Sequence, residues 1–217
     1  FWKNSTENYY SEIMKNDLTE GRMAFEKQLD IMCAGAFSVS NDSDLKWVYF
    51  LDGLKDGDNN IAALIRCNDM LRQTFADSEH YQNYSVIMKN ELIFRKSGMV
   101  VGDKFFYDNY CTYQNTDFET WRKQSFEADT WQLFPLEEID TGEETLQAMT
   151  FSYPVRNYIQ QEQEANAVVQ FLLSKENLEQ MFGQLLSRQG GILIYDAEDR
   201  LLASLGKINA DGDDPEN

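Results

Sequence analysis

The passage that decides the fold class lies near the C-terminal end and reads AVVQFLLSKENL over residues 167–178. Its first seven residues are apolar except for Gln170, which is typical of a strand in the middle of a sheet. Ser174 is a good N-cap, and an apolar helical stripe follows from Leu178 to Leu186. A buried strand that leads directly into an amphipathic helix predicts a sheet with helices packed on it, the α+β class.

Further strand signals lie on both sides of this passage. Residues 85–94 are rich in Val, Ile, Leu and Phe, and the turn signal at 95–98 precedes Met99-Val100-Val101, so we expect a β-hairpin. Residues 148–155 alternate between apolar and polar, the period of a half-buried strand. Residues 192–195 and 201–204 flank a turn and predict another hairpin. Because one hairpin is marginally stable alone, we expect it to open a second, unfinished sheet.

Helices are expected in the first 80 residues. From Tyr9 to Met32, apolar residues recur at spacings of three, four and seven, which predicts an amphipathic helix long enough to form a spine. A loop with Gly35 and a polar run at 41–44 should follow, then a short helix at 45–51, a turn-rich linker at 52–60 and a helix at 61–75. The helical spine could form a homodimer seam or pack on the domain's own sheet.

An aromatic region separates the two groups of strands. It runs from Phe105 to Trp131, and Asp117 is expected to cap a short helix that places Phe118, Trp121 and Ser125 on one face. The acidic stretch 137–144 predicts a solvated loop, and residues 157–166 predict another loop.

Composition excludes several classes of function. The chain has 217 residues, 37 acidic and 19 basic side chains, a net charge of −18 and a pI near 4.3. Such a chain lacks the basic footprint that nucleic acid requires, so no nucleic-acid partner is expected. No stretch of about 18 apolar residues and no secretory signal occurs. The aromatic pair at Phe1 and Trp2 suggests a chain cut from a longer protein beside a membrane.

The sequence lacks the residues and motifs that are common at catalytic sites. His80 is the only histidine, and the three cysteines Cys33, Cys67 and Cys111 are far apart, which predicts buried thiols and no metal cluster. The sequence contains no nucleophile elbow, phosphate loop or zinc motif. The acidic run at 52–60 fails as a calcium loop because positions three and twelve carry Leu54 and Ala63. We therefore expect no enzyme activity, no metal and no cofactor.

The order of these segments resembles the double-Cache family of extracytoplasmic bacterial sensor domains. The residues that carry the resemblance are the hairpin LIFRKSGMVV at 92–101, Trp121 downstream of it, the passage 167–178 and the final hairpin at 191–204. The resemblance implies a long N-terminal helical spine, a PAS-like antiparallel sheet, and the start of a second, membrane-proximal module. It also implies an extracellular or periplasmic location, flanking transmembrane helices, and a cytoplasmic output unit such as a histidine kinase, a chemoreceptor region or an AraC-like regulator.

The resemblance divides the chain into four parts. These are a helical spine and second helical segment at 1–80, a membrane-distal ligand-sensing domain at 81–174, a connecting helix and first membrane-proximal hairpin at 175–208, and an acidic disordered tail at 209–217.

Family members that bind amino acids use an aromatic, an arginine, a tryptophan and a second aromatic close together, and an aspartate near the last strand of the distal sheet. Trp121 matches the tryptophan, and Tyr113 or Phe118 could be the aromatic, but Arg122 follows the tryptophan instead of preceding it, and residues 171–173 hold no carboxylate. The hypothesis is a pocket for a small extracellular solute. Its candidate lining residues are Phe94, Tyr107, Tyr110, Tyr113, Trp121, Arg122 and Tyr153.

Two alternatives remain open at this stage. The aromatic residues could be ordinary core, and Arg122, which could bind a carboxylate or phosphate bidentately, could instead form a surface ion pair with the acids around it. The whole chain could also be a surface protein–protein interaction module with no small-molecule ligand.

Overall fold

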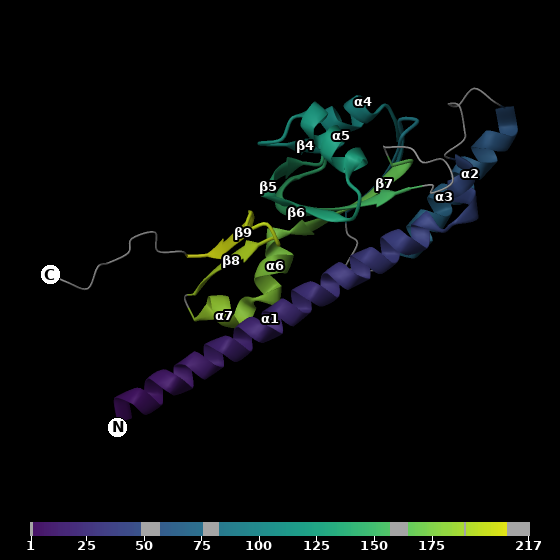
Figure 1. The fold of residues 1–217 in the computed structure, drawn as a ribbon. Coiled ribbons are helices and arrows are strands. Elements are labelled where there is room, and N and C mark those ends of the chain that lie inside the picture. The colour runs from purple at the N-terminus through teal and green to yellow at the C-terminus, as the bar shows by residue number, and fades with distance from the viewer. Residues whose placement is uncertain (1, 49–56, 76–82, 157–164, 189, 208–217) are drawn as a thin grey trace.

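The computed structural model describes residues 2–48, 57–75, 83–156, 165–188 and 190–207 (Figure 1). The helices are α1 (Trp2–Ser40), α2 (Ser43–Val48), α3 (Gly57–Phe75), α4 (Asp103–Tyr110), α5 (Phe118–Glu127), α6 (Lys175–Met181) and α7 (Gly183–Ser187). The strands are β1 (Tyr84–Met88), β2 (Leu92–Arg95), β3 (Gly98–Val101), β4 (Thr112–Tyr113), β5 (Gln132–Asp140), β6 (Thr145–Val155), β7 (Ala167–Ser174), β8 (Gly191–Tyr195) and β9 (Leu201–Gly206).

A seven-stranded antiparallel sheet forms the body of the molecule, in the order β3-β2-β1-β7-β6-β5-β4. The strand at 167–174 is its middle strand, as the apolar run predicted. Ser174 caps α6 by accepting a hydrogen bond from the amide of Asn177 at 3.2 Å. The hairpin β8-β9 forms a separate two-stranded sheet. The predicted α+β class, with a long helix followed by an antiparallel sheet, is confirmed.

Helices cover the sheet on both faces. Figure 1 shows α1 passing along one side of the molecule, while α4 and α5 lie on the opposite side of the sheet. The face toward α1 and α3, here called the spine face, is part of a continuous apolar cluster that includes Val86, Phe151 and Phe171. The face toward α4 and α5, here called the far face, belongs to a second cluster around Trp121 and Phe126.

The spine helix also holds the C-terminal segments in place. Arg188, beside the end of α7, donates a hydrogen bond to the buried carboxylate of Asp17 in α1 at 2.7 Å. Gly21 lies so close to the ring of Phe182 that any side chain at this position would force the ring to move. Only part of the predicted apolar stripe on α1 is covered, because Met32 is buried but Met14 and Leu18 are about half exposed.

Four predicted boundaries are wrong. The loop at Gly35 is absent, since α1 continues to Ser40. Residues 85–94 form two strands, because the chain reverses at residues 89–91, where Glu91 has φ +67°. The acidic stretch 137–144 belongs to the β5-β6 hairpin. Ile139 is buried between the exposed Glu138 and Asp140, so these carboxylates face water although the segment is a strand. The helix expected through Leu186 is divided at Phe182.

The first 80 residues contain no strand in the part that the structure describes. Of the predicted linker at 52–60, residues 52–56 lie outside the described residues. Residues 57–60 form the first turn of α3 instead. The short helix predicted at 45–51 is described only to Val48. His80, the segment 157–164 and the tail 209–217 lie outside the described residues.

Candidate functional site

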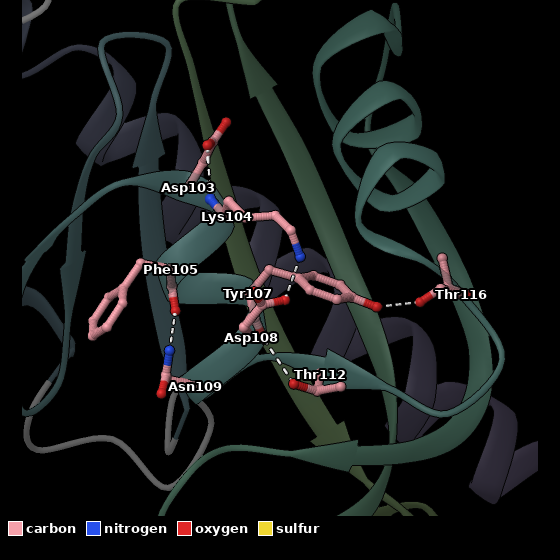
Figure 2. A network of polar contacts seen from close by, with 8 residues as sticks. All are labelled: Asp103, Lys104, Phe105, Tyr107, Asp108, Asn109, Thr112 and Thr116. Atoms are coloured by element: carbon pink, nitrogen blue, oxygen red, sulfur yellow. Dashed lines mark hydrogen bonds and ion pairs between the residues drawn. The ribbon is translucent and has the colours of Figure 1, made fainter.

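Helix α4 lies over the far face, and polar contacts fix its position (Figure 2). The hydroxyl of Tyr107 donates to the backbone carbonyl of Thr116, and the hydroxyl of Thr112 donates to the carbonyl of Tyr107 at 2.8 Å. On the outer side, Lys104 Nζ pairs with Asp108 Oδ1 at 2.6 Å. The short helix is therefore tied at its C-terminal end to the loop that leads to α5.

A cavity of about 560 Å³ lies where the C-terminal end of α4 meets the far face. Two turns border it, the β2-β3 turn at 95–98 and the β5-β6 turn at 141–144. The β5-β6 turn fits closely against α4, because a side chain at Gly142 (φ +75°) would collide with the backbone carbonyl of Asn109. The lining residues used below are Ser85, Arg95, Phe106, Tyr110, Cys111, Glu143 and Gln170.

A polar row crosses the apolar sheet and forms part of the cavity wall. Ser85 on β1 lies opposite Gln170 on β7, which lies opposite Ser152 on β6. All three side chains are buried, and Gln170 Nε2 donates to Ser125 Oγ of α5 at 2.9 Å. Within the described residues, Gln170 Oε1 has no hydrogen-bond partner. A buried amide oxygen without a partner costs about 1–3 kcal/mol. This atom has almost no accessible surface, so a solute in the cavity would reach it only if the wall moved.

Arg95 provides a positive charge in the cavity wall. It ends β2 directly opposite Ser85, so it extends the polar row by one strand. Its guanidinium carbon lies 4.0 Å from the centre of the Tyr110 ring, and its Nη2 donates to Glu143 Oε1 at 2.9 Å. A largely buried arginine stacked on an aromatic ring is held in a fixed orientation.

The aromatic cluster predicted from the sequence lies beside this cavity. Trp121 is almost fully buried, with ring centroids 5.4 Å from Tyr107 and 6.2 Å from Phe106. Its Nε1 has no hydrogen-bond partner among the described residues. Tyr113 forms a hydroxyl–hydroxyl hydrogen bond of 2.8 Å with Thr150, and burial raises the pKa of its phenol well above the usual range. These rings form the packed core between α4, α5 and the sheet.

Of the seven predicted lining residues, four lie in or against one cluster, and Phe94, Arg122 and Tyr153 lie elsewhere. Only Tyr110 lines the cavity, while Tyr107, Tyr113 and Trp121 belong to the adjoining core. Phe94 and Tyr153 lie on the spine face, because side chains alternate along β2 and β6.

Arg122 is used to join two helices. Its Nε donates to Asp103 Oδ2 at 2.6 Å, and its guanidinium carbon lies 5.0 Å from the centre of the Phe126 ring. The acids expected to pair with it were its neighbours in sequence, but the partner is the first residue of α4. The pair therefore connects α5 to the N-terminal end of α4, and neither residue lines the cavity.

Sequence analysis missed most of the cavity residues. Gln170 carried a usable signal, since it is the one polar residue in an otherwise apolar central strand. Arg95 looked like part of a turn. Cys111 was expected to be buried, and it is: burial raises the pKa of its thiol to about 12, so it stays protonated at neutral pH.

The described residues offer little for metal or membrane chemistry. No group of three or more His, Cys, Asp or Glu side chains that could hold a metal ion occurs in these parts of the chain. No described helix combines the length and apolar content that crossing a bilayer requires.

No protein-family model matches this sequence, and no curated protein is significantly similar to it. Solved structures are similar in fold. The extracellular domain of the histidine kinase vpHK1S-Z8 aligns at TM-score 0.53 and 11% identity, over 83% of this chain and 62% of that domain. The periplasmic sensory domain of the Campylobacter jejuni chemoreceptor Tlp1 aligns at TM-score 0.50 and 10% identity, over 88% of this chain and 67% of that one.

A third match is the sensory domain of the Campylobacter jejuni chemoreceptor Tlp3, solved with isoleucine bound. It aligns at TM-score 0.45 and 14% identity, over 91% of this chain and 73% of that one. The chain spans less than two thirds of the histidine-kinase domain. The alignments at TM-scores of 0.53 and 0.50 confirm the fold expected from the Cache resemblance: this chain has the fold of those two extracytoplasmic sensory domains.

Proposed function

We propose that this chain is the extracellular or periplasmic ligand-sensing domain of a membrane-bound bacterial signal-transduction protein, and that it binds a small solute in the far-face cavity. The fold supports the sensory role, since the solved domains that share it are extracytoplasmic sensory domains. Flanking transmembrane helices and an output unit such as a histidine kinase, chemoreceptor region or AraC-like regulator belong to the same proposal.

The observation that carries the proposal is the cavity with its polar wall. Its volume of about 560 Å³ is within the usual range for small-molecule sites. Ser85 on β1 lines the cavity in the same polar row as Gln170, and its hydroxyl can both donate to a solute and accept from it. Together with Arg95, this hydroxyl offers a solute polar partners on an otherwise apolar sheet.

Signalling would follow from the position of the sheet between the cavity and α1. The solute contacts the far face, and the spine face of the same strands packs against the helix that would lead to the membrane. A solute that binds one arrangement of the sheet on α1 more tightly would shift the population toward it. The free energy available is the difference in affinity between the two arrangements.

A thermal-stability screen against small metabolites tests the proposal. A solute at one hundred times its Kd stabilises the folded state by about 2.7 kcal/mol, which raises the Tm by about 5 to 10 °C in a chain of this size. Ser85→Leu, which extends an apolar side chain into the cavity, should abolish the shift. Ser204→Leu makes the same change at an exposed position on β9 and should preserve it.

If no solute raises the Tm, the proposal is wrong. Formation of a stable complex with another extracytoplasmic protein, without any solute effect, would favour the protein-interaction module instead. A solute whose effect survives Ser85→Leu binds elsewhere, which would remove the cavity from the proposal.

A further inference from the structure

The ion pair at the cavity joins one fixed partner and one exposed partner. Arg95 is only 14% exposed and lies over the Tyr110 ring, whereas Glu143 is 68% exposed on the β5-β6 turn. An exposed carboxylate recovers its hydration when it leaves such a pair, so the pair contributes little stability. The arginine has no equivalent freedom, because moving it would break its contact with the ring. Glu143 is therefore the partner that can be exchanged.

The described contact also leaves part of the guanidinium unused. Glu143 accepts one hydrogen bond, from Nη2, although a guanidinium can present two parallel N–H groups to one carboxylate. A free carboxylate in the cavity can adopt the bidentate geometry more easily than a side chain tethered to the β5-β6 turn. Lys96 also lines the cavity and adds a second positive charge on the same side.

The opposite part of the wall is neutral. From Arg95 the polar row continues through Ser85 to Gln170, whose Oε1 lacks a partner among the described residues. The carboxylates that line the cavity, Glu143 and Glu144, both lie on the β5-β6 turn, and Glu143 pairs with Arg95. A solute held against this wall would need a negative group at Arg95 and a neutral hydrogen-bonding group at Ser85.

We propose that the cavity takes a small organic carboxylate bearing a neutral donor such as a hydroxyl, and that its carboxylate replaces Glu143 at Arg95. This rests on the solute-sensing function proposed above and specifies the class of solute. Glu143 acts as an internal competitor that occupies Arg95 when the site is empty. Binding therefore releases the β5-β6 turn from β2, so that solute occupancy changes a contact between strands that β1 and β7 separate in the sheet.

Calorimetric titration with matched acid and amide pairs tests the class of solute. The probes are sodium lactate against lactamide, and sodium succinate against succinamide, at constant ionic strength. At least one acid should bind, and its amide should bind at least tenfold more weakly. Arg95→Gln should reduce the affinity for that acid about tenfold or more, because the charged donor pair is lost.

Glu143→Gln tests the competition directly. It should increase the affinity for the acid about two- to fivefold, which corresponds to removing a competing carboxylate that is itself largely exposed. The matched control is Glu26→Gln, which removes the carboxylate of the exposed Arg22–Glu26 pair on α1 and should leave the affinity unchanged. Because Glu143 lies on an exposed turn, its substitution keeps the test valid even if Arg95→Gln fails to fold.

Each contrary outcome has a separate meaning. If the amides bind as tightly as the acids, or if only amines or neutral solutes bind, the anionic class is wrong and the solute-sensing function stands. If an acid binds but Glu143→Gln leaves its affinity unchanged or lowers it, the displacement of Glu143 is wrong. If no solute of any class binds or raises the Tm, the sensing function fails, and this inference fails with it.

Discussion

The two faces of β7 differ in kind although they belong to the same eight residues. Toward α1 and α3 the strand presents Val169, Phe171 and Leu173, all buried in the apolar cluster of the spine face. Toward α4 and α5 it presents Val168 and Leu172 around Gln170, which belongs to a polar row and borders a cavity. One face is packed for stability, and the other includes a buried polar group that packing alone does not explain.

This difference indicates that the far face of the sheet, and not the spine face, has the binding role. Gln170 departs from the apolar packing of the rest of β7, and its unpartnered amide oxygen lowers the stability of the folded chain. Among the described strands, the spine face has one comparable group, the buried hydroxyl of Tyr84 on β1, but it has no polar row. Substitutions at neighbouring residues of β7 can therefore separate a stability role from a binding role.

The largest effect is expected from Phe171→Ala. Phe171 is fully buried, with ring centroids 5.2 Å from Phe75 and 6.0 Å from Phe151, so truncation leaves a cavity in the spine face. We expect a loss of about 3–5 kcal/mol in the free energy of unfolding, measured by urea titration followed by circular dichroism. The control is Leu172→Ala at the next residue of β7, whose side chain lies on the far face and is partly exposed. An equal loss at both positions would contradict the distinction between the faces.

A smaller effect on stability, with a large effect on binding, is expected from Gln170→Met. Methionine has nearly the volume of glutamine and removes the unpartnered oxygen, while the hydrogen bond to Ser125 is lost. Removing the unpartnered oxygen stabilises the fold, and losing the hydrogen bond destabilises it. The free energy of unfolding should therefore change by about 1 kcal/mol or less. Any solute that stabilises the native chain should lose affinity for this variant in calorimetry. A loss of stability as large as that of Phe171→Ala would mean that the polar row is structural.

Local signals were sufficient for much of the fold. The apolar run of β7, the cap at Ser174 and the cap at Asp117, whose side chain accepts from the amide of Thr120, are encoded within a few residues and were predicted correctly. Strand β5 was missed because its C-terminal part is acidic apart from the buried Ile139, and such a segment looks like a solvated loop. The division of residues 85–94 was missed because the reversal at Glu91 has no glycine.

The cavity could not be predicted in the same way. Its residues come from β1, β2, α4, the β5-β6 turn and β7, and only the strand order brings these segments together. Counting alternate positions would have separated Phe94 from Arg95, which point to opposite faces of β2. It would not have shown which face holds the cavity. That depends on α1 covering one face and α4 leaving space over the other.

The smallest predicted effect compares two buried thiols, one on each side of the sheet. Burial raises the pKa of Cys67, in the spine-face cluster, and of Cys111, at the cavity, from 9.0 to about 12. A thiol whose pKa is raised by folding contributes stability that is fully present below pH 9 and is lost as the pH rises toward 12. The free energy of unfolding should therefore fall between pH 8 and pH 9.5, by about 0.8 kcal/mol or less for each thiol.

Alanine substitutions separate the two contributions. Cys67→Ala and Cys111→Ala should each reduce the slope of unfolding free energy against pH, measured by urea titration at several pH values between 8 and 9.5. Equal reductions would mean that the cavity wall excludes water from Cys111 as completely as the spine face excludes it from Cys67. If Cys67→Ala reduces the slope and Cys111→Ala leaves it unchanged, water in the cavity reaches the Cys111 thiol. The far face would then be hydrated down to its core, and a solute would bind there by displacing water.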